Sequence, residues 1–289
     1  LDLTRQAVQE LVSLYYEEAR SAYLSKELAS LADLFVNDAF GTAHRAQAST
    51  EGAIRKAKVA CAGPLMKGEL DAFAKVLDNP KRPLVAIIGG SKVSTKLGLL
   101  DNLLGRVDRL IIGGGIANTF LAATGHPVGK SLYEPDLIDA SKEILAKAEK
   151  LGKPIPLPVD VVTAPELAPG QKAVTCGVDE VASDQMILDI GPKTVALYEE
   201  ILNKAATIVW NGPVGAFETD PFGAGTRALA EALAKCGGFV VVGGGDSVSA
   251  VESYGLADKM GYISTGGGAF LELFEGKKLP AVAALEDRA

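Results

Sequence analysis

The chain has 289 residues, of which 48% are hydrophobic and 22% are charged, and its formal net charge is −7. This composition is typical of a globular protein long enough for two domains, and the negative charge excludes a diffuse basic surface for nucleic acid or an anionic membrane. The apolar runs are far shorter than the roughly 20 residues of a membrane span. Three widely spaced cysteines, Cys61, Cys176 and Cys236, argue against a disulfide framework or a thiolate zinc site and favour a reducing, intracellular compartment.

The first 63 residues differ in character from the rest of the chain. Residues 1–33 predict about two helical segments, and ADLFVNDAFG (32–41) predicts a strand and a turn. The next segment, 64–83, predicts a helix that ends near Pro80, because proline interrupts helical hydrogen bonding. This helix could link a small N-terminal part to a larger domain.

Six short apolar segments then follow, and most of them end in glycine or proline. Their apolar residues are continuous rather than alternating, as expected for strands that are covered on both faces. Helical patterns such as 136–152 and 225–238 lie between them, so we predict an α/β fold with a parallel six-stranded Rossmann-like sheet and helices on both faces. The predicted strands lie within residues 84–90, 109–115, 155–162, 207–213, 239–245 and 262–268.

Four glycine-rich turns lie at the carboxyl ends of these strands, where sheets of this kind bind ligands. A single glycine turn is usually structural, but four at one edge are harder to explain by packing alone. Glycine allows close approach of a ligand, and a following helix N-terminus suits an anion such as phosphate. The four turns are GGSKVSTK (89–96), GGGIANTF (113–120), GGGDSVSA (243–250) and TGGGAFLE (265–272).

Charged residues on two of the turns indicate phosphoryl chemistry. Lys92 and Lys96 are expected on one helical face near a helix N-terminus, where a bound polyphosphate would relieve their mutual repulsion. Asp246 would repel a phosphate unless a cation lay between them. Together these residues could neutralise a migrating phosphoryl group and hold its metal. Two solvated surface lysines are an equally good reading of the pair taken alone.

Two further segments contain residues of the kind that bind nucleotides. Asn211 and Glu218 lie in WNGPVGAFETD (210–220), where a rigid Gly-Pro backbone presents polar groups, although Asn-Gly-Pro is also ordinary turn chemistry. Glu218 would be a plausible acceptor for ribose hydroxyls. GAGTRA (223–228) matches the dinucleotide fingerprint but follows no predicted strand, which counts against a dinucleotide oxidoreductase.

Taken together, the motifs resemble those of the phosphoglycerate kinase family, in its bacterial or plastid branch. The order WNGPVG, GGGDS, STGGGA is very specific, and the resemblance covers about residues 31–289. The matching motifs are NDAFGTAHRA (37–46), LMKGEL (65–70), AIIGGSKVSTK (86–96), IIGGG (111–115), LPVDVV (157–162), LDIGP (188–192), WNGPVGAFE (210–218), GGGDS (243–247), STGGGAFLE (264–272) and LPAVAALED (279–287).

The resemblance implies an enzyme that moves a phosphoryl group reversibly between 1,3-bisphosphoglycerate and ADP, giving 3-phosphoglycerate and ATP, with Mg²⁺ as cofactor. It implies a cytoplasmic protein, or one of the plastid stroma, that acts as a monomer without nucleic-acid or membrane partners. The implied divisions are a remnant of the N-terminal phosphoglycerate-binding α/β domain (1–63), an interdomain helix (64–80), a nucleotide-binding domain (81–276) and a tail returning toward the N-terminal domain (277–289).

The resemblance also implies roles for single residues. Lys92 would stabilise the transferring phosphoryl group, with Gly244 and Gly267 as the other catalytic positions, while Asp246 would hold the metal and Arg45 would bind phosphoglycerate. The implied nucleotide-binding residues are Gly90, Ser91, Lys96, Gly114, Gly115, Leu188, Asn211, Glu218, Gly243, Gly245, Asp246 and Ser247.

The sequence departs from the family pattern mainly at its beginning. It contains neither the R-V-D-F-N-type strand motif nor the S-H-L-G-R-P-type loop, so we expect about the first 100 residues of the family's N-terminal domain to be lacking. Those motifs supply most of the substrate-binding arginines. The alternative reading is therefore a nucleotide-binding fragment that binds Mg-ADP or Mg-ATP without transfer activity.

Overall fold

The computed structural model describes residues 21–288, which fold into two compact units. The smaller unit contains the residues up to Asp71 together with those from Gly268 onward, and the larger unit runs from Ala72 to Gly267. The helix expected before residue 21 lies outside the described residues, whereas residues 21–30 are helical. The finer division at residues 63, 80 and 276 stays a prediction.

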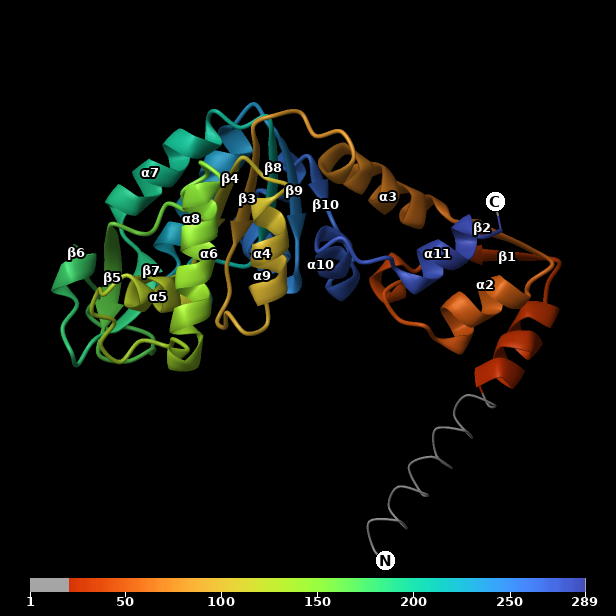
Figure 1. Ribbon diagram of the computed structural model, residues 1–289, viewed down its shortest axis with the longest axis horizontal. Coiled ribbons are helices and arrows are strands. Elements are labelled where there is room, and N and C mark those ends of the chain that lie inside the picture. Colours follow the sequence, from red (N-terminus) through yellow and green to blue (C-terminus); the bar gives the residue numbers. More distant parts are fainter. Residues whose placement is uncertain (1–20, 289) are drawn as a thin grey trace, which may run out of the picture. The chain divides into compact units, whose positions relative to one another are not determined.

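A five-stranded parallel sheet forms the centre of the larger unit, with the strand order β10-β9-β8-β3-β4 (Figure 1). Ile87 pairs with Trp210, which in turn pairs with Val242, so β3, β8 and β9 lie side by side. These inner strands are buried almost throughout, which explains their continuous apolar sequences. The strands are β3 (Leu84–Ile88), β4 (Arg109–Ile112), β8 (Thr207–Asn211), β9 (Phe239–Gly243) and β10 (Tyr262–Ile263).

The expectation of six strands in this sheet was wrong for one segment, residues 155–162. That segment leads into β5 (Asp160–Ala164), the central strand of a separate antiparallel sheet with the order β6-β5-β7. No crossover helix follows β5, because the chain turns through a loop directly into β6 (Val174–Gly177), and a parallel neighbour requires such a crossover. β5 is nevertheless buried, so its apolar pattern does not reveal which sheet it joins. β7 is Met186–Ile190.

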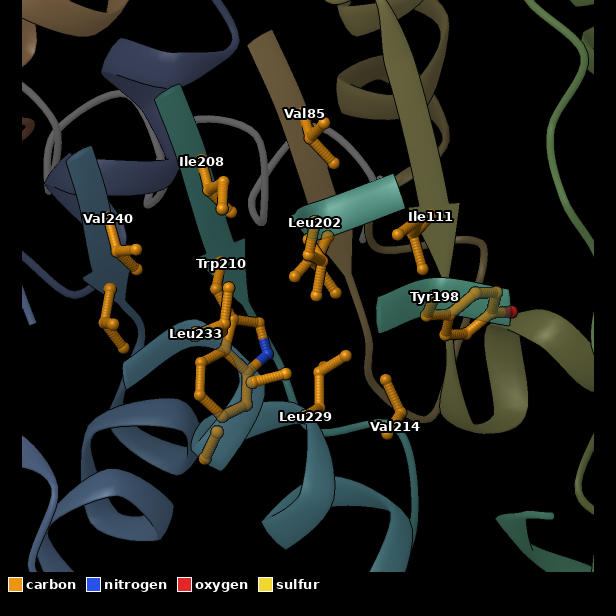
Figure 2. Close-up of a cluster of buried hydrophobic side chains, with 14 of the residues drawn as sticks. Val85, Ile111, Tyr198, Leu202, Ile208, Trp210, Val214, Leu229, Leu233 and Val240 are labelled. Atoms are coloured by element: carbon orange, nitrogen blue, oxygen red, sulfur yellow. The ribbon is translucent and has the colours of Figure 1, made fainter. Parts of the chain in front are cut away.

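Helices cover both faces of the parallel sheet (Figure 1). On one face, α7, α8 and α9 bury their apolar side chains against the strands; Figure 2 shows Leu229 and Leu233 of α8 around the indole of Trp210. The predicted helices over residues 136–152 and 225–238 are confirmed as α6 and α8. The helices are α4 (Leu97–Leu104), α5 (Gly114–Ala123), α6 (Ile138–Lys150), α7 (Pro192–Leu202), α8 (Ala224–Lys235) and α9 (Gly245–Ser253), with short 3-10 turns at Pro135–Leu137, Val178–Glu180 and Ala257–Lys259.

Trp210 links this core directly to a glycine turn. Its side chain is fully buried, and its indole N–H donates a hydrogen bond to the carbonyl oxygen of Gly212 at 2.8 Å. A buried indole N–H without a partner would be costly, so the bond fixes the direction in which the chain leaves β8.

The smaller unit is built around a parallel pair of strands, β1 (Leu34–Asn37) and β2 (Val59–Ala62). The strand and turn predicted over residues 32–41 are confirmed, since η1 (Phe40–Thr42) follows β1. A π-helical turn (Ala48–Gly52) runs into α2 (Ala53–Lys56), and α3 (Pro64–Leu77) ends before Pro80 as predicted. The remaining helices are α10 (Gly268–Phe274) and α11 (Pro280–Glu286).

The C-terminal residues complete this smaller unit. The backbone N–H of Ala281 donates to the carbonyl oxygen of Ala43 at 3.1 Å, and Ala281 is fully buried. The guanidinium of Arg288 donates to the carbonyl oxygens of Arg55, Ala57 and Lys58. These contacts tie α11 to α2 and β2. Over residues 21–288, no helix is both long and apolar enough to cross a membrane.

Candidate active site

A cavity of about 540 Å³ opens in the larger unit, where the turns after β3, β4, β8 and β9 converge. Its volume lies within the range of ordinary small-molecule sites. Its place at the carboxyl ends of parallel strands is the one that the sequence predicts. The predicted residues that line it are Gly90, Ser91, Gly114, Gly115, Leu188, Glu218 and Asp246.

Much of the cavity wall is apolar and was not predicted. Beside the predicted Leu188, the antiparallel sheet contributes Val161, Met186, Ile187 and Ile190, and the segment after β8 contributes Val214 and Phe217. Leu132 and Leu167 come from loops, and Asn118 from α5 adds a polar group. A largely apolar wall with a few polar groups suits a flat aromatic base attached to a polar sugar. The glycine turns gave no signal for this wall, because its residues lie on other segments.

Two of the glycine turns touch backbone to backbone. Gly114 has φ +64°, and a Cβ atom there would lie 2.6 Å from the carbonyl oxygen of Gly90. A Cβ atom on Gly115 would lie 2.3 Å from the carbonyl oxygen of Ser91. Only glycine fits at these two positions. The close packing of the turns after β3 and β4 therefore accounts for these glycines even before a ligand is considered.

Lys96 points inward from the turn after β3. Its Nζ donates to the carbonyl oxygen of Gly89 at 2.7 Å and to Asn211 Oδ1 at 2.6 Å, and both acceptors are uncharged. Burial lowers the pKa of Lys96 to about 8, although the carboxylate of Asp246 acts in the opposite direction. A half-buried ammonium without a carboxylate in hydrogen-bond contact is well suited to meet an anionic ligand.

Lys92, by contrast, is exposed, and the expectation that Lys92 and Lys96 share one helical face was wrong. Helix α4 begins at Leu97, after both lysines. The hydroxyl of Thr95 donates to the carbonyl oxygen of Lys92, and the N–H of Lys96 donates to that of Val93. The side chain of Lys92 is exposed, whereas that of Lys96 is bound to Gly89 and Asn211, so the two lysines lie in different surroundings.

Asp246 lies in the first turn of α9, directly after a turn at Gly244 with φ +91°. Its side chain is exposed, and the residue lines the cavity. Within residues 21–288, no group of three or more histidine, cysteine, aspartate or glutamate residues could hold a metal ion. A metal at Asp246 would therefore need further oxygen ligands from a bound phosphate or from water.

The other predicted residues of the larger unit act behind the cavity rather than in its wall. Asn211 Nδ2 donates to the carbonyl oxygen of Gly243 at 2.8 Å, and the hydroxyl of Ser247 accepts from the N–H of Gly212 at 2.5 Å. Asn211 and Ser247 are buried, so they join the turns after β8 and β9. Gly243, Gly244, Gly245 and Gly267 are also absent from the residues that line the cavity.

Arg45 belongs to the smaller unit, where it follows η1 and is exposed. Its Nε lies 3.4 Å from Nε2 of His44, a contact too long to fix the guanidinium firmly. Its predicted role in binding phosphoglycerate stays a prediction.

Asp189 is a functional candidate that the sequence did not reveal. It lines the cavity and is buried, and it accepts hydrogen bonds from the N–H groups of Ile190 and Gly225 at 2.9 and 2.7 Å. Burial raises its pKa to about 7, against the effect of these two hydrogen bonds. The only sign of a functional residue in the sequence was an aspartate within the apolar strand MILDI, and this aspartate was interpreted only as part of the family motif LDIGP.

A parallel sheet whose strand ends carry an apolar cavity, a half-buried lysine and an acid on a helix N-terminus defines a nucleotide-dependent phosphotransferase of the α/β class. The family model described as phosphoglycerate kinase matches residues 7–277. The chain belongs to the phosphoglycerate kinase family.

Named relatives agree with this assignment. The chain is 68% identical over 273 residues to phosphoglycerate kinase of Desulfovibrio desulfuricans, an alignment that covers 94% of this chain and 70% of the relative. It is 60% identical over 266 residues to that of Nitratidesulfovibrio vulgaris, covering 92% of this chain and 68% of the relative. Among solved structures, phosphoglycerate kinase from Coxiella burnetii superposes with a TM-score of 0.89 at 54% identity, covering 92% of this chain and 68% of that one. The protein is thus an enzyme, and a fragment without transfer activity is not the favoured reading.

Proposed function

We propose that this chain carries out the reaction of its family, the reversible transfer of a phosphoryl group between 1,3-bisphosphoglycerate and ADP. In the direction of ATP formation, an oxygen of the β-phosphate of ADP forms a bond to the phosphorus of the acyl phosphate. The bond from that phosphorus to the acyl oxygen breaks, and 3-phosphoglycerate leaves as a carboxylate. The observation that carries the proposal is the convergence of four strand-end turns on one apolar cavity beside Lys96 and Asp246.

In this proposal the cavity holds the nucleoside. The adenine ring lies against Leu188 and the neighbouring apolar wall, between the turn at Gly114 and the segment after β8. The exposed carboxylate of Glu218 accepts hydrogen bonds from the ribose hydroxyls. Burial of the base against apolar side chains supplies binding energy, and the ribose contact fixes the direction in which the phosphates leave the cavity.

The phosphates then meet the turn after β3 and the start of α9. Lys96 neutralises phosphate charge, and the free backbone N–H groups at Gly244 and Gly245 are suited to bind anionic oxygens. Asp246 would hold Mg²⁺, which, when bound, neutralises the charge of the nucleotide phosphates. Lys92 is exposed, so its side chain can follow the phosphoryl group as it moves. A cation beside the moving group lowers the energy barrier of the transfer. Gly267 would contact the phosphoryl group during its transfer, and Arg45 would bind phosphoglycerate.

The test is a transfer assay on this chain with ATP and 3-phosphoglycerate, coupled to loss of NADH. We expect turnover that requires Mg²⁺ and is lost in Lys92→Ala. Lys172→Ala, which removes an exposed lysine outside the site, should leave the rate unchanged. If the chain binds Mg-ADP without turnover, it supplies the nucleotide site alone; if it binds no nucleotide, the proposal is wrong.

We also propose that the protein is a cytoplasmic monomer. Sedimentation of the purified chain would check the oligomeric state, and fractionation of the source cells would check the location.

A further inference from the structure

We propose that Glu134 is a positioning residue that ties the turn carrying Lys92 and Lys96 to the wall of the nucleoside cavity. We call residues 92–96 the lysine turn. The inference rests on the proposed function and adds to it a residue that holds the phosphate-binding turn in place beside the nucleoside cavity.

The carboxylate of Glu134 holds Ser94 with both of its oxygens. Its Oε2 accepts the backbone N–H of Ser94 at 2.8 Å, and its Oε1 accepts the Ser94 hydroxyl at 2.5 Å. Ser94 lies midway between Lys92 and Lys96 in the sequence. Hydrogen bonds to an ionised carboxylate are about twice as strong as neutral ones, and two of them on one residue fix its orientation as well as its position.

The lysine turn depends on this outside support. The turn precedes α4, so of its residues only Lys96 takes part in a helical hydrogen bond, as the acceptor from the N–H of Leu100, and the buried side chain of Val93 is its apolar anchor. Lys92, Ser94 and Thr95 are exposed. Loss of the Glu134 contact would leave the exposed part of the turn held mainly by the bond from Thr95 to Lys92.

The other side of Glu134 is attached to the cavity. Its backbone N–H donates to the Thr119 hydroxyl at 3.1 Å, and Asn118 Nδ2 donates to the carbonyl oxygen of Leu132 at 3.1 Å. Asn118 and Leu132 line the cavity, and α5, which carries Asn118 and Thr119, begins with the cavity residue Gly114. A continuous series of contacts therefore runs from the cavity wall through Glu134 to the lysine turn.

The charge of Glu134 supports the same role. Burial acts to raise the pKa of its carboxyl group, but hydrogen bonds from Ser94 and Val93 and the nearby Lys92 lower the pKa below its ordinary value. Glu134 is therefore ionised at neutral pH. Its negative charge interacts favourably with the nearby Lys92, which stays exposed.

Isothermal titration calorimetry of adenosine and of Mg-ADP into the full chain tests the inference. Adenosine reaches only the cavity, whereas ADP also meets the lysine turn. In Glu134→Gln we expect the dissociation constant of adenosine to stay within about twofold and that of ADP to rise about tenfold, since the charged contact is lost. Ser94→Ala should act in the same direction, and the double variant should be little worse than Glu134→Gln, because both changes remove the same contact.

Asp136→Asn is the matched control, because it removes an exposed carboxylate two residues away that has no hydrogen bond of its own to the lysine turn. Both ligands should bind to it as they do to the unaltered chain. Equal losses for adenosine and ADP in Glu134→Gln and Ser94→Ala would show a general structural defect and overturn the inference, as would unchanged ADP affinity. If the unaltered chain bound neither ligand, the proposed function itself would fall, and the inference with it.

Discussion

Lys96 Nζ lies 2.6 Å from Asn211 Oδ1, so the turn after β3 is joined to the end of β8 by a bond between a cation and a neutral amide. Asn211 in turn donates to Gly243 at the end of β9. One amide side chain thus connects three adjacent strands at the edge where the phosphates are proposed to bind. The consequences of this arrangement can be measured.

The low pKa of Lys96 predicts that ADP binding depends on pH above neutrality. The pKa is about 8 in the free chain, and a bound phosphate raises it, because the anion favours the ammonium form. Binding then takes up a proton above pH 8, so affinity should fall as pH rises from 8 to 9.5, by at most about tenfold per pH unit. Titrations of ADP at pH 7, 8, 8.8 and 9.5 check this. Lys96→Arg, which stays charged throughout, should show a flatter profile; parallel profiles would contradict the assignment.

The raised pKa of Asp189 predicts that the stability of the folded chain depends on pH. Its pKa rises from 3.8 to about 7 on folding, so the folded chain binds more protons than the unfolded chain between these values. The free energy of unfolding should therefore fall as pH rises from 5 to 8, by on the order of 2 kcal/mol from this residue. Urea denaturation of the chain and of Asp189→Asn checks this. The difference between the two proteins should change with pH, and a constant difference would refute the prediction.

The proposed role of Asp246 as a metal ligand predicts that its substitution changes the effect of Mg²⁺ on ADP binding. Asp246→Asn removes the proposed metal ligand and also a negative charge near the phosphates. We expect Mg²⁺ to strengthen ADP binding several-fold less in this variant, while ADP without metal binds as well as before or better. Calorimetry with Mg²⁺ and with EDTA measures both effects. Asp258→Asn removes an exposed aspartate from the turn Ala257–Lys259 and should respond to magnesium normally; a normal response in Asp246→Asn would exclude its role as ligand.

Gly244 and Gly245 form a matched pair for stability. Gly244 has φ +91°, and a Cβ atom there would lie 2.5 Å from Asn211 Nδ2, whereas nothing lies within 4 Å of one on Gly245. We expect Gly244→Ala to lower the free energy of unfolding by about 1–3 kcal/mol. Gly245→Ala should be neutral or slightly stabilising, because alanine favours the helix. Equal effects in urea denaturation would show that the conformation at Gly244 is not required.

The sequence predicted the elements whose pattern is local. The strands that end in glycine turns, the helices α6 and α8, and the edge of the sheet where the turns meet could all be inferred from apolar runs and glycine positions. The pairing of β5 could not be, because burial makes a central antiparallel strand as apolar as a parallel one. The loop from β5 to β6 is too short for a crossover helix, but β6 (Val174–Gly177) is partly exposed and was not recognised as a strand in the sequence.

The candidate site was predicted less completely than the fold. Glycines and charges mark the phosphate side, but Leu132, Leu167 and Phe217 reach the cavity from loops with no pattern of their own. Lys92 and Lys96 were expected on one helical face, and they are not on one, because the helix begins one residue after the second of them. The number of residues between two side chains in a turn does not determine how buried each one is or which way it points. Contacts between distant segments, such as that of Glu134 with Ser94, leave no trace in one sequence.

The smaller unit is made of residues from both ends of the described chain. This arrangement sets the order in which the two units can fold during synthesis. The ribosome makes residues 72–267 before those from Gly268 onward, and domains generally fold as units as they emerge. The larger unit can therefore form its cavity while the unit that carries Arg45 still lacks α10 and α11. The bonds from Arg288 to Ala57 and Lys58 are among the last to form. Nascent chains would thus form the cavity of the larger unit before the smaller unit is complete, so a ribosome stalled soon after residue 267 has emerged would display that cavity without a finished smaller unit.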